Sequence, residues 1–154
     1  MRKSLLSLMA IVLGALIVAS LSVGASRSET FGLKAALDAR QEVPRQAVKV
    51  PAARGTFSGT LTARGSTAKI AWRLIFTHLS GRALQAHIHR GKLGKAGPIS
   101  VTLCAPCRSG LRGTVKVTPR VVRAIKSGAA YLNVHTRKNP NGEIHGQIRL
   151  VQGS

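Results

Sequence analysis

The chain has 154 residues. It contains 24 Lys and Arg but only 4 Asp and Glu, which gives a formal net charge of +20. With so few carboxylates, no pair of them can be named as a catalytic acid and base. The sequence also contains no Gly-x-Ser-x-Gly elbow, Gly-rich phosphate loop or His-Glu-x-x-His motif. No hydrolase arrangement therefore emerges from the sequence, whereas a charge of this size favours acidic partners.

The first 25 residues have the pattern of a secretory signal peptide. Arg2 and Lys3 precede a stretch rich in Leu, Ile, Val and Ala, and Val23 and Ala25 suit a cleavage site after Ala25. We predict a secreted, periplasmic or cell-envelope protein, with an uncleaved membrane anchor as the alternative because the apolar stretch is long. The remaining residues 26–154 have the length of a single domain. They include 22 basic and 4 acidic residues.

Alternating apolar and polar residues predict strands over most of this domain. The strongest apolar face belongs to Ile70, Trp72, Leu74 and Phe76, which indicates a central strand. We predict an all-β fold, an antiparallel β-sandwich of about eight short strands. The expected strands are 31–38, 56–62, 69–77, 84–89, 99–103, 113–117, 131–135 and 143–150.

One short helix is expected after the sixth strand. Thr118 can serve as its N-cap, Pro119 suits its first position and Gly128 supplies its end. Apolar residues recur between them at helical spacing (Val121, Val122 and Ile125). The run Asn139-Pro140-Asn141-Gly142 predicts a chain reversal, so the last two strands should form a hairpin.

Cys104 and Cys107 are the only cysteines. In an exported protein this spacing predicts a disulfide in a tight loop, because the compartment is oxidising. A redox-active pair is the alternative, although such pairs usually open a helix, and here a strand precedes the motif. Zinc ligation would need a second pair of ligands.

Histidines occupy alternate positions of two predicted strands. His87 and His89 share one strand face, and Tyr131, Asn133 and His135 share one face of a second strand. If these strands are neighbours, three imidazoles can converge. Neutral imidazole is a ligand for copper, zinc and nickel, and three histidines leave positions open for water or a small ligand.

Several motifs follow one another along the chain: Gln41 to Pro44, Ala86 to Gly91 with Gly97 to Ile99, Tyr131 to Thr136, and Asn141 to Gln147. Together they resemble the chordin-type (CHRD) domain, and the resemblance covers nearly all of residues 26–154. It implies an extracellular or periplasmic β-sandwich. The His-x-His strand is also similar, locally, to the copper strand of the copper/zinc superoxide dismutases.

The chain departs from the family at His145, where the family usually has Arg after Gly-Glu-Ile. His145 shares a strand face with Glu143 and Gln147, so it can add a fourth imidazole near His135. The alternative is that it is a polar replacement on a solvated face.

These observations predict an exported CHRD-type binding or interaction module with a transition-metal site. The metal is copper, or zinc as the alternative, and its ligands are His87, His89 and His135, with His145 as a further candidate. Two alternatives remain, a copper-dependent enzyme acting on superoxide and a structural envelope protein whose histidines brace loops. An enzyme is the less favoured reading, because a dismutase-like metal pair needs a bridging imidazole and a carboxylate-bearing zinc site.

The expected partners are acidic cell-envelope polymers or another extracellular protein. Nucleic acid is not expected, because the few aromatic residues mostly fall on apolar strand faces and leave no stacking platform. Contact with a membrane is expected only through an uncleaved N-terminal segment.

Overall fold

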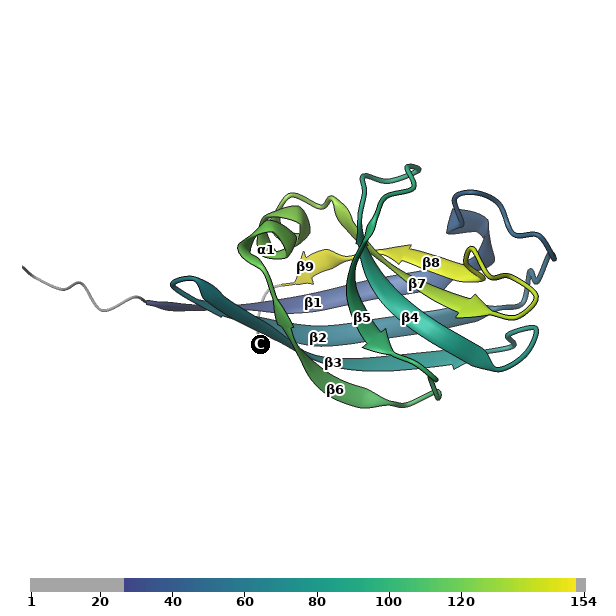
Figure 1. Cartoon of the computed structure of the whole chain (residues 1–154), viewed down its shortest axis with the longest axis horizontal. Helices are drawn as coiled ribbons and strands as arrows, with labels where there is room; N and C mark the ends of the chain where they lie inside the picture. Colours follow the sequence, from purple (N-terminus) through teal and green to yellow (C-terminus); the bar gives the residue numbers. More distant parts are fainter. Residues whose placement is uncertain (1–26, 152–154) are drawn as a thin grey trace, which may run out of the picture.

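The structure is a computed structural model that describes residues 27–151, so the predicted signal segment 1–25 lies outside the described residues. Nine strands, one α-helix and one short 3-10 helix follow one another along this part of the chain (Figure 1). They are β1 (Ser28–Asp38), η1 (Ala39–Gln41), β2 (Arg54–Arg64), β3 (Thr67–Thr77), β4 (Ala83–Arg90), β5 (Ile99–Cys104), β6 (Arg112–Val117), α1 (Pro119–Lys126), β7 (Ala130–Thr136), β8 (Ile144–Gln147) and β9 (Arg149–Val151).

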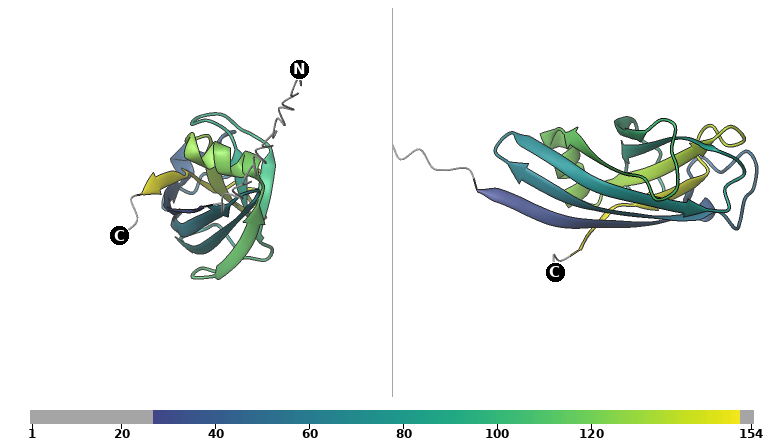
Figure 2. Two further views of the ribbon diagram at one scale, coloured as in Figure 1. Left: turned by 90° about the vertical axis from the view of Figure 1, so that its left-hand side faces the viewer. Right: turned by 90° about the horizontal axis from the view of Figure 1, so that it is seen from below.

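All strand pairs are antiparallel, in the order β5-β4-β7-β8-β1-β2-β3-β6, with β9 also paired to β1. The sheet curves so that its end strands β5 and β6 contact each other, and the end-on view shows a nearly closed, two-layered β-structure (Figure 2). The layer that contains β4 and β7 packs against the long strands β1, β2 and β3 (Figure 1). The predicted all-β antiparallel fold with one short helix is confirmed.

The last predicted strand, 143–150, is divided at Ile148. β8 pairs with β7 through four residue pairs, whereas β9 pairs with β1. Between them the backbone N–H of Ile148 donates to the carbonyl of Ala130 at 2.9 Å. A period-2 pattern runs unbroken through such a change of partner, so the sequence predicted one strand where the structure has two.

The core lies between the two layers and contains the apolar residues of each strand. Strand alternation turns Ile70, Leu74, Leu132 and Val134 inward, and all four are fully buried. Complete burial of one such side chain stabilises the fold by roughly 1.5 to 3 kcal/mol. These residues fix the register, because a shift by one residue would expose the whole apolar set.

The predicted helix and disulfide are both confirmed. Thr118 Oγ1 accepts a hydrogen bond from the backbone N–H of Val121, Pro119 is the first helical residue, and Gly128 follows the helix with a φ of 69°. The disulfide joins Cys104 at the end of β5 to Cys107, whose backbone N–H donates to the carbonyl of Ala83 at the start of β4. Within residues 27–151, no helix is both long and apolar enough to cross a membrane.

Candidate metal centre

The candidate site lies on the outer face of the layer formed by β4, β7 and β8. His87 pairs with Asn133 across β4 and β7, His89 pairs with Tyr131, and Asn133 pairs with His145 across β7 and β8. Because neighbouring residues in register point to the same side, these polar residues share one face. The buried polar side chains on or beside it are Glu42, His87, His89, Asn133, His135, Thr136, Asn139, Glu143, His145 and Gln147.

Loops cover this face and account for its burial. Val48, in the loop between η1 and β2, donates its backbone N–H to Asn139 in the β7–β8 loop at 2.8 Å. The loop between β4 and β5 contacts the same face through Gly97, which accepts a hydrogen bond from His89. The polar face is therefore enclosed by backbone segments that can orient its side chains.

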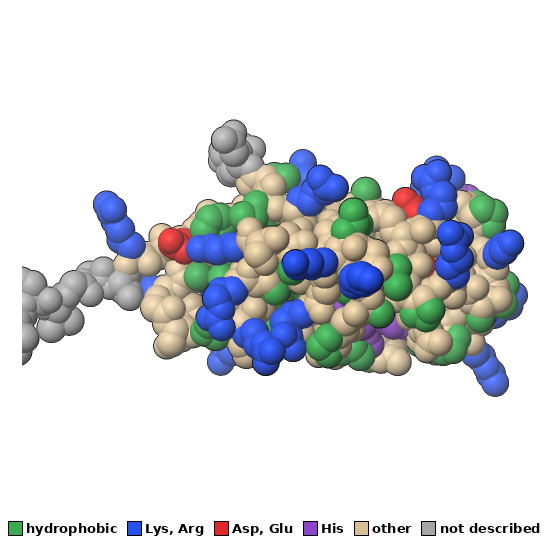
Figure 3. Space-filling view, turned by 90° about the horizontal axis from the view of Figure 1, so that it is seen from above, with side chains coloured by type: hydrophobic (Ala, Val, Ile, Leu, Met, Phe, Trp, Pro, Cys, Tyr) green, Lys and Arg blue, Asp and Glu red, His purple; other side chains and the backbone are tan. Residues whose placement is uncertain are grey.

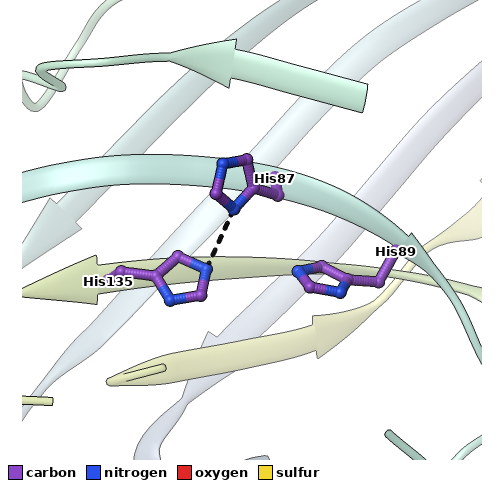
Figure 4. A group of neighbouring side chains, drawn as sticks. All are labelled: His87, His89 and His135. Carbon is purple, nitrogen blue, oxygen red and sulfur yellow. Dashed lines mark hydrogen bonds between the residues drawn. The ribbon is translucent and has the colours of Figure 1, made fainter. Parts of the chain in front are cut away.

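Three histidines converge at the centre of the face. Nitrogen atoms of His87, His89 and His135 all lie within 4.8 Å of one another, and the Nδ1 of His87 is 3.1 Å from the Nε2 of His135 (Figure 4). His87 and His89 come from β4 and His135 from β7, as the alternation of the sequence predicted. The structure thus confirms the prediction that three imidazoles lie close together.

Two backbone carbonyls determine which nitrogens face the centre. The Nδ1 of His89 is 2.9 Å from the carbonyl oxygen of Gly97, and the Nδ1 of His135 is 2.9 Å from that of Pro140. A carbonyl oxygen only accepts, so each Nδ1 carries the hydrogen and each Nε2 keeps its lone pair. Metal-binding histidines are usually oriented by this kind of hydrogen bond from the second ring nitrogen.

The spacing of the nitrogens approaches that of a metal-ligand set. Nitrogens bound tetrahedrally at 2.0–2.1 Å from a zinc ion are about 3.3 Å apart, close to the 3.1 Å between His87 and His135. Without a metal, the Nδ1–H of His87 donates to the Nε2 of His135. The Nε2 of His89 is buried and has no hydrogen-bond partner in the described protein, so one lone pair of the group is unused.

The electrostatics of the site favour neutral imidazoles. Burial, reinforced by the neighbouring His135 and His89, lowers the pKa of His87 to about 4. Burial also lowers the pKa of His89 and that of His135, although their hydrogen bonds to Gly97 and Pro140 act in the opposite direction. All three rings are therefore neutral near pH 7, the form that binds metal ions.

His145 lies beside this group but not in it. Tyr131 stacks on His89 with ring centroids 4.8 Å apart and on His145 with centroids 4.0 Å apart. Because β7 lies between β4 and β8, the Tyr131 ring separates the two histidines. His145 is only 1% exposed, which contradicts a solvated replacement, and burial lowers its pKa to about 4.

Two buried carboxylates support the site in ways that the sequence did not predict. Glu143 accepts hydrogen bonds from the backbone and hydroxyl of Ser80, from Thr136 and from Asn139. Burial would raise the pKa of Glu143, but these hydrogen bonds outweigh it and lower the pKa. No periodicity links Ser80, in the connection between β3 and β4, to Glu143, so only the folded chain could show the contact.

Glu42 is the second buried carboxylate. It accepts a hydrogen bond from Asn133 at 3.3 Å, and its other oxygen has no partner among the described residues. Burial raises its pKa to about 8, with a further increase from Glu143 that the hydrogen bond from Asn133 opposes. Glu42 is therefore mostly protonated at neutral pH and adds little negative charge to the face.

Comparison with known proteins agrees with this architecture. The family model described as the CHRD domain matches residues 33–148, about three quarters of the chain. No curated protein and no solved structure matched, and the local similarity to copper/zinc superoxide dismutases is not supported by any comparison. The matched span runs from β1 to the end of β8 and includes every histidine of the site. The chain therefore belongs to the CHRD domain family.

Proposed function

We propose that this protein is an exported CHRD-type binding module that holds one transition-metal ion on His87, His89 and His135. The observation that carries the proposal is the pair of hydrogen bonds from Nδ1 of His89 to Gly97 and from Nδ1 of His135 to Pro140. These bonds leave two Nε2 lone pairs beside His87, in a buried group whose imidazoles are neutral.

Copper is the first candidate and zinc the second. An all-imidazole ligand set suits both ions, and the general order of affinities places copper(II) above zinc. Three protein ligands leave at least one position for water or a small ligand. The three histidines remain 4% to 8% exposed, which leaves an approach for an ion.

We do not extend the proposal to superoxide chemistry. A dismutase-like pair of metals needs a bridging imidazole and a carboxylate-bearing second site. Within residues 27–151, the group that can hold an ion consists only of histidines.

The module acts outside the cytoplasm, where CHRD domains occur, and we propose the cell envelope as its location. The support is the family match together with the signal pattern of residues 1–25. Its proposed partner is an acidic envelope polymer or another extracellular protein. The excess of 22 basic over 4 acidic residues in residues 26–154 favours the polymer.

Titration of the purified, untagged protein with copper(II) and zinc(II), against a chelator of known affinity, tests the metal site. We expect one ion per chain, and we expect His89→Ala to weaken its binding at least about a hundredfold, because one of three ligands and its carbonyl-fixed lone pair are lost. His78→Ala is the matched control, because His78 is exposed and outside the group. Equal affinity in wild type and His89→Ala would reject the site.

A further inference from the structure

A second candidate site lies where α1 faces the loop between β4 and β5. The surface there is hollowed, with a volume of about 500 Å³, and four of its eight lining residues are basic. The lining residues are Arg90, Gly91, Lys92, Arg120, Arg123, Ala124, Ser127 and Ala129. We name this hollow the basic hollow.

The helix supplies one wall through a single stripe of side chains. Arg123, Ala124 and Ser127 lie three, four and seven residues after Arg120, so the four residues share one face of α1 and its C-cap. The opposite face is anchored by buried apolar residues (Val121, Val122 and Ile125). Anchoring of that face directs the two arginines away from the core and into the basic hollow.

Arg120 lies in an electrostatically unfavourable place for helix stability. It is the second residue of α1, where the positive end of the helix dipole disfavours a cation, and no acidic residue occupies the first turn. A bound anion would offset the charge of Arg120 together with the positive end of the helix dipole. Arg120 therefore lies where an anion can interact with both the side chain and the start of the helix.

The strand side of the basic hollow is held rigidly. The Nε of Arg90 donates to the hydroxyl of Ser100 at 3.0 Å, which fixes the guanidinium while its terminal nitrogens stay available. Gly91 donates its backbone N–H to Ala129 at 2.9 Å and accepts a hydrogen bond from the side chain of Gln147. These bonds join the end of β4 to the segment after α1, so both walls keep their spacing.

Within residues 27–151, no acidic side chain is free to neutralise these cations. The whole chain has four acidic residues. Glu29 pairs with Lys126 and Asp38 with Arg40, while Glu42 and Glu143 are buried on the histidine face. Figure 3, which looks onto the side that carries α1, shows many basic and few acidic side chains. In the part of the chain that the structure describes, the basic hollow thus has no counter-charge of its own.

We propose that the basic hollow binds phosphate groups of an anionic polymer. Three guanidinium groups match the tetrahedral oxygens of a phosphate through paired hydrogen bonds, a geometry that lysine alone does not provide. The basic hollow is open rather than enclosed, so a polymer chain can run across it. The inference rests on the proposed binding role, but not on the metal, because the histidine ligands are not part of the lining.

The test measures the affinity of the untagged protein for linear polyphosphate and for inorganic phosphate by calorimetry at fixed ionic strength. Arg120→Ala/Arg123→Ala should weaken polyphosphate binding about tenfold or more and should reduce the slope of log affinity against log salt by about two. Both side chains are exposed, so the fold and the metal affinity should not change. Arg120→Lys/Arg123→Lys should restore only part of the affinity, because charge returns without the planar donors.

The matched control removes two other arginines. Arg73 and Arg112 are exposed and lie directly opposite each other in β3 and β6. Arg73→Ala/Arg112→Ala should weaken binding less than about twofold. Equal losses in the two double variants, or no loss in either, would overturn the site. If inorganic phosphate binds as tightly as polyphosphate and is lost in the same variant, the site stands and its ligand is free phosphate.

Discussion

The tautomers of two histidines are the smallest feature on which the metal site depends. His89 and His135 each donate from Nδ1 to a loop carbonyl, so the fold decides which nitrogen can bind a metal. The sequence could place the three imidazoles on one face, because strand alternation is a local property. It could not supply the carbonyls of Gly97 and Pro140, because their direction depends on how two loops fold over the sheet.

At the same scale, Glu143 holds one of these loops. Its carboxylate accepts from Ser80, Thr136 and Asn139. We expect Glu143→Gln to lower the free energy of unfolding at pH 7 by about 2 kcal/mol, because charge-assisted hydrogen bonds are lost and an amide donor faces other donors. Urea unfolding measures this change. Because the pKa of Glu143 is lowered, the difference from wild type should shrink as the pH falls through that pKa.

Glu29→Gln is the control for this prediction. Glu29 also pairs with a side chain, Lys126, but both groups are exposed, so the substitution should change the free energy of unfolding by less than about 0.5 kcal/mol. Equal effects of the two substitutions would show that the Glu143 network does not stabilise the β7–β8 loop.

At the scale of elements, β4 and its following loop connect the two proposed sites. His89 faces the histidine group, whereas the next residue, Arg90, lines the basic hollow. Helix α1 and most strand positions follow from capping and alternation, which act over a few residues. The division into β8 and β9 does not, because it depends on a change of partner strand.

A substitution in the β4–β5 loop should disturb the metal site without removing a ligand. A Cβ at Gly97 would lie 1.8 Å from the carbonyl oxygen of Arg90, so Gly97→Ala must displace the loop backbone. The carbonyl that orients His89 would move with it, and we expect copper affinity to fall about tenfold, as for other orienting partners of metal ligands. Competition titration measures the affinity.

Gly81→Ala, in the connection between β3 and β4, is the matched control for Gly97→Ala, because nothing lies within 4 Å of the added Cβ. It should leave the copper affinity unchanged. Unchanged affinity in Gly97→Ala as well would mean that the carbonyl of Gly97 does not orient His89.

At the scale of the whole molecule, burial of four neutral histidines makes stability depend on pH. The pKa values of His87 and His145 are about 4, and those of His89 and His135 are also lowered, against about 6.5 in an unfolded chain. Between pH 6.5 and 4 the unfolded chain therefore binds protons that the folded protein does not. Stability should fall as the pH decreases through this interval.

Glu42 acts in the opposite direction. Its pKa is raised to about 8. The stability that the buried, protonated carboxyl contributes is therefore complete below pH 4.5 and is lost as the pH rises toward 8. Below pH 6.5 the effect of four histidines on stability outweighs that of one carboxyl, and above pH 6.5 only Glu42 changes the stability. The metal-free protein should therefore be most stable near pH 6.5. Urea midpoints at pH 5, 6.5 and 8, with a chelator present, measure the profile.

Glu42→Gln separates the two contributions, because the amide does not titrate. It should abolish the decline between pH 6.5 and 8 and leave the acidic decline in place. A wild-type protein more stable at pH 5 than at pH 6.5 would contradict the assignment of neutral, buried histidines.

The measurement that tests the account most directly is an anomalous diffraction map, recorded at the copper edge, of crystals of the copper-loaded protein. The account predicts one strong peak at about 2.0 Å from the Nε2 of His89, the Nε2 of His135 and one ring nitrogen of His87. Crystals of His89→Ala, loaded in the same way, should lose this peak. A copper peak elsewhere in the wild-type protein, with none among these three histidines, would contradict the central claim.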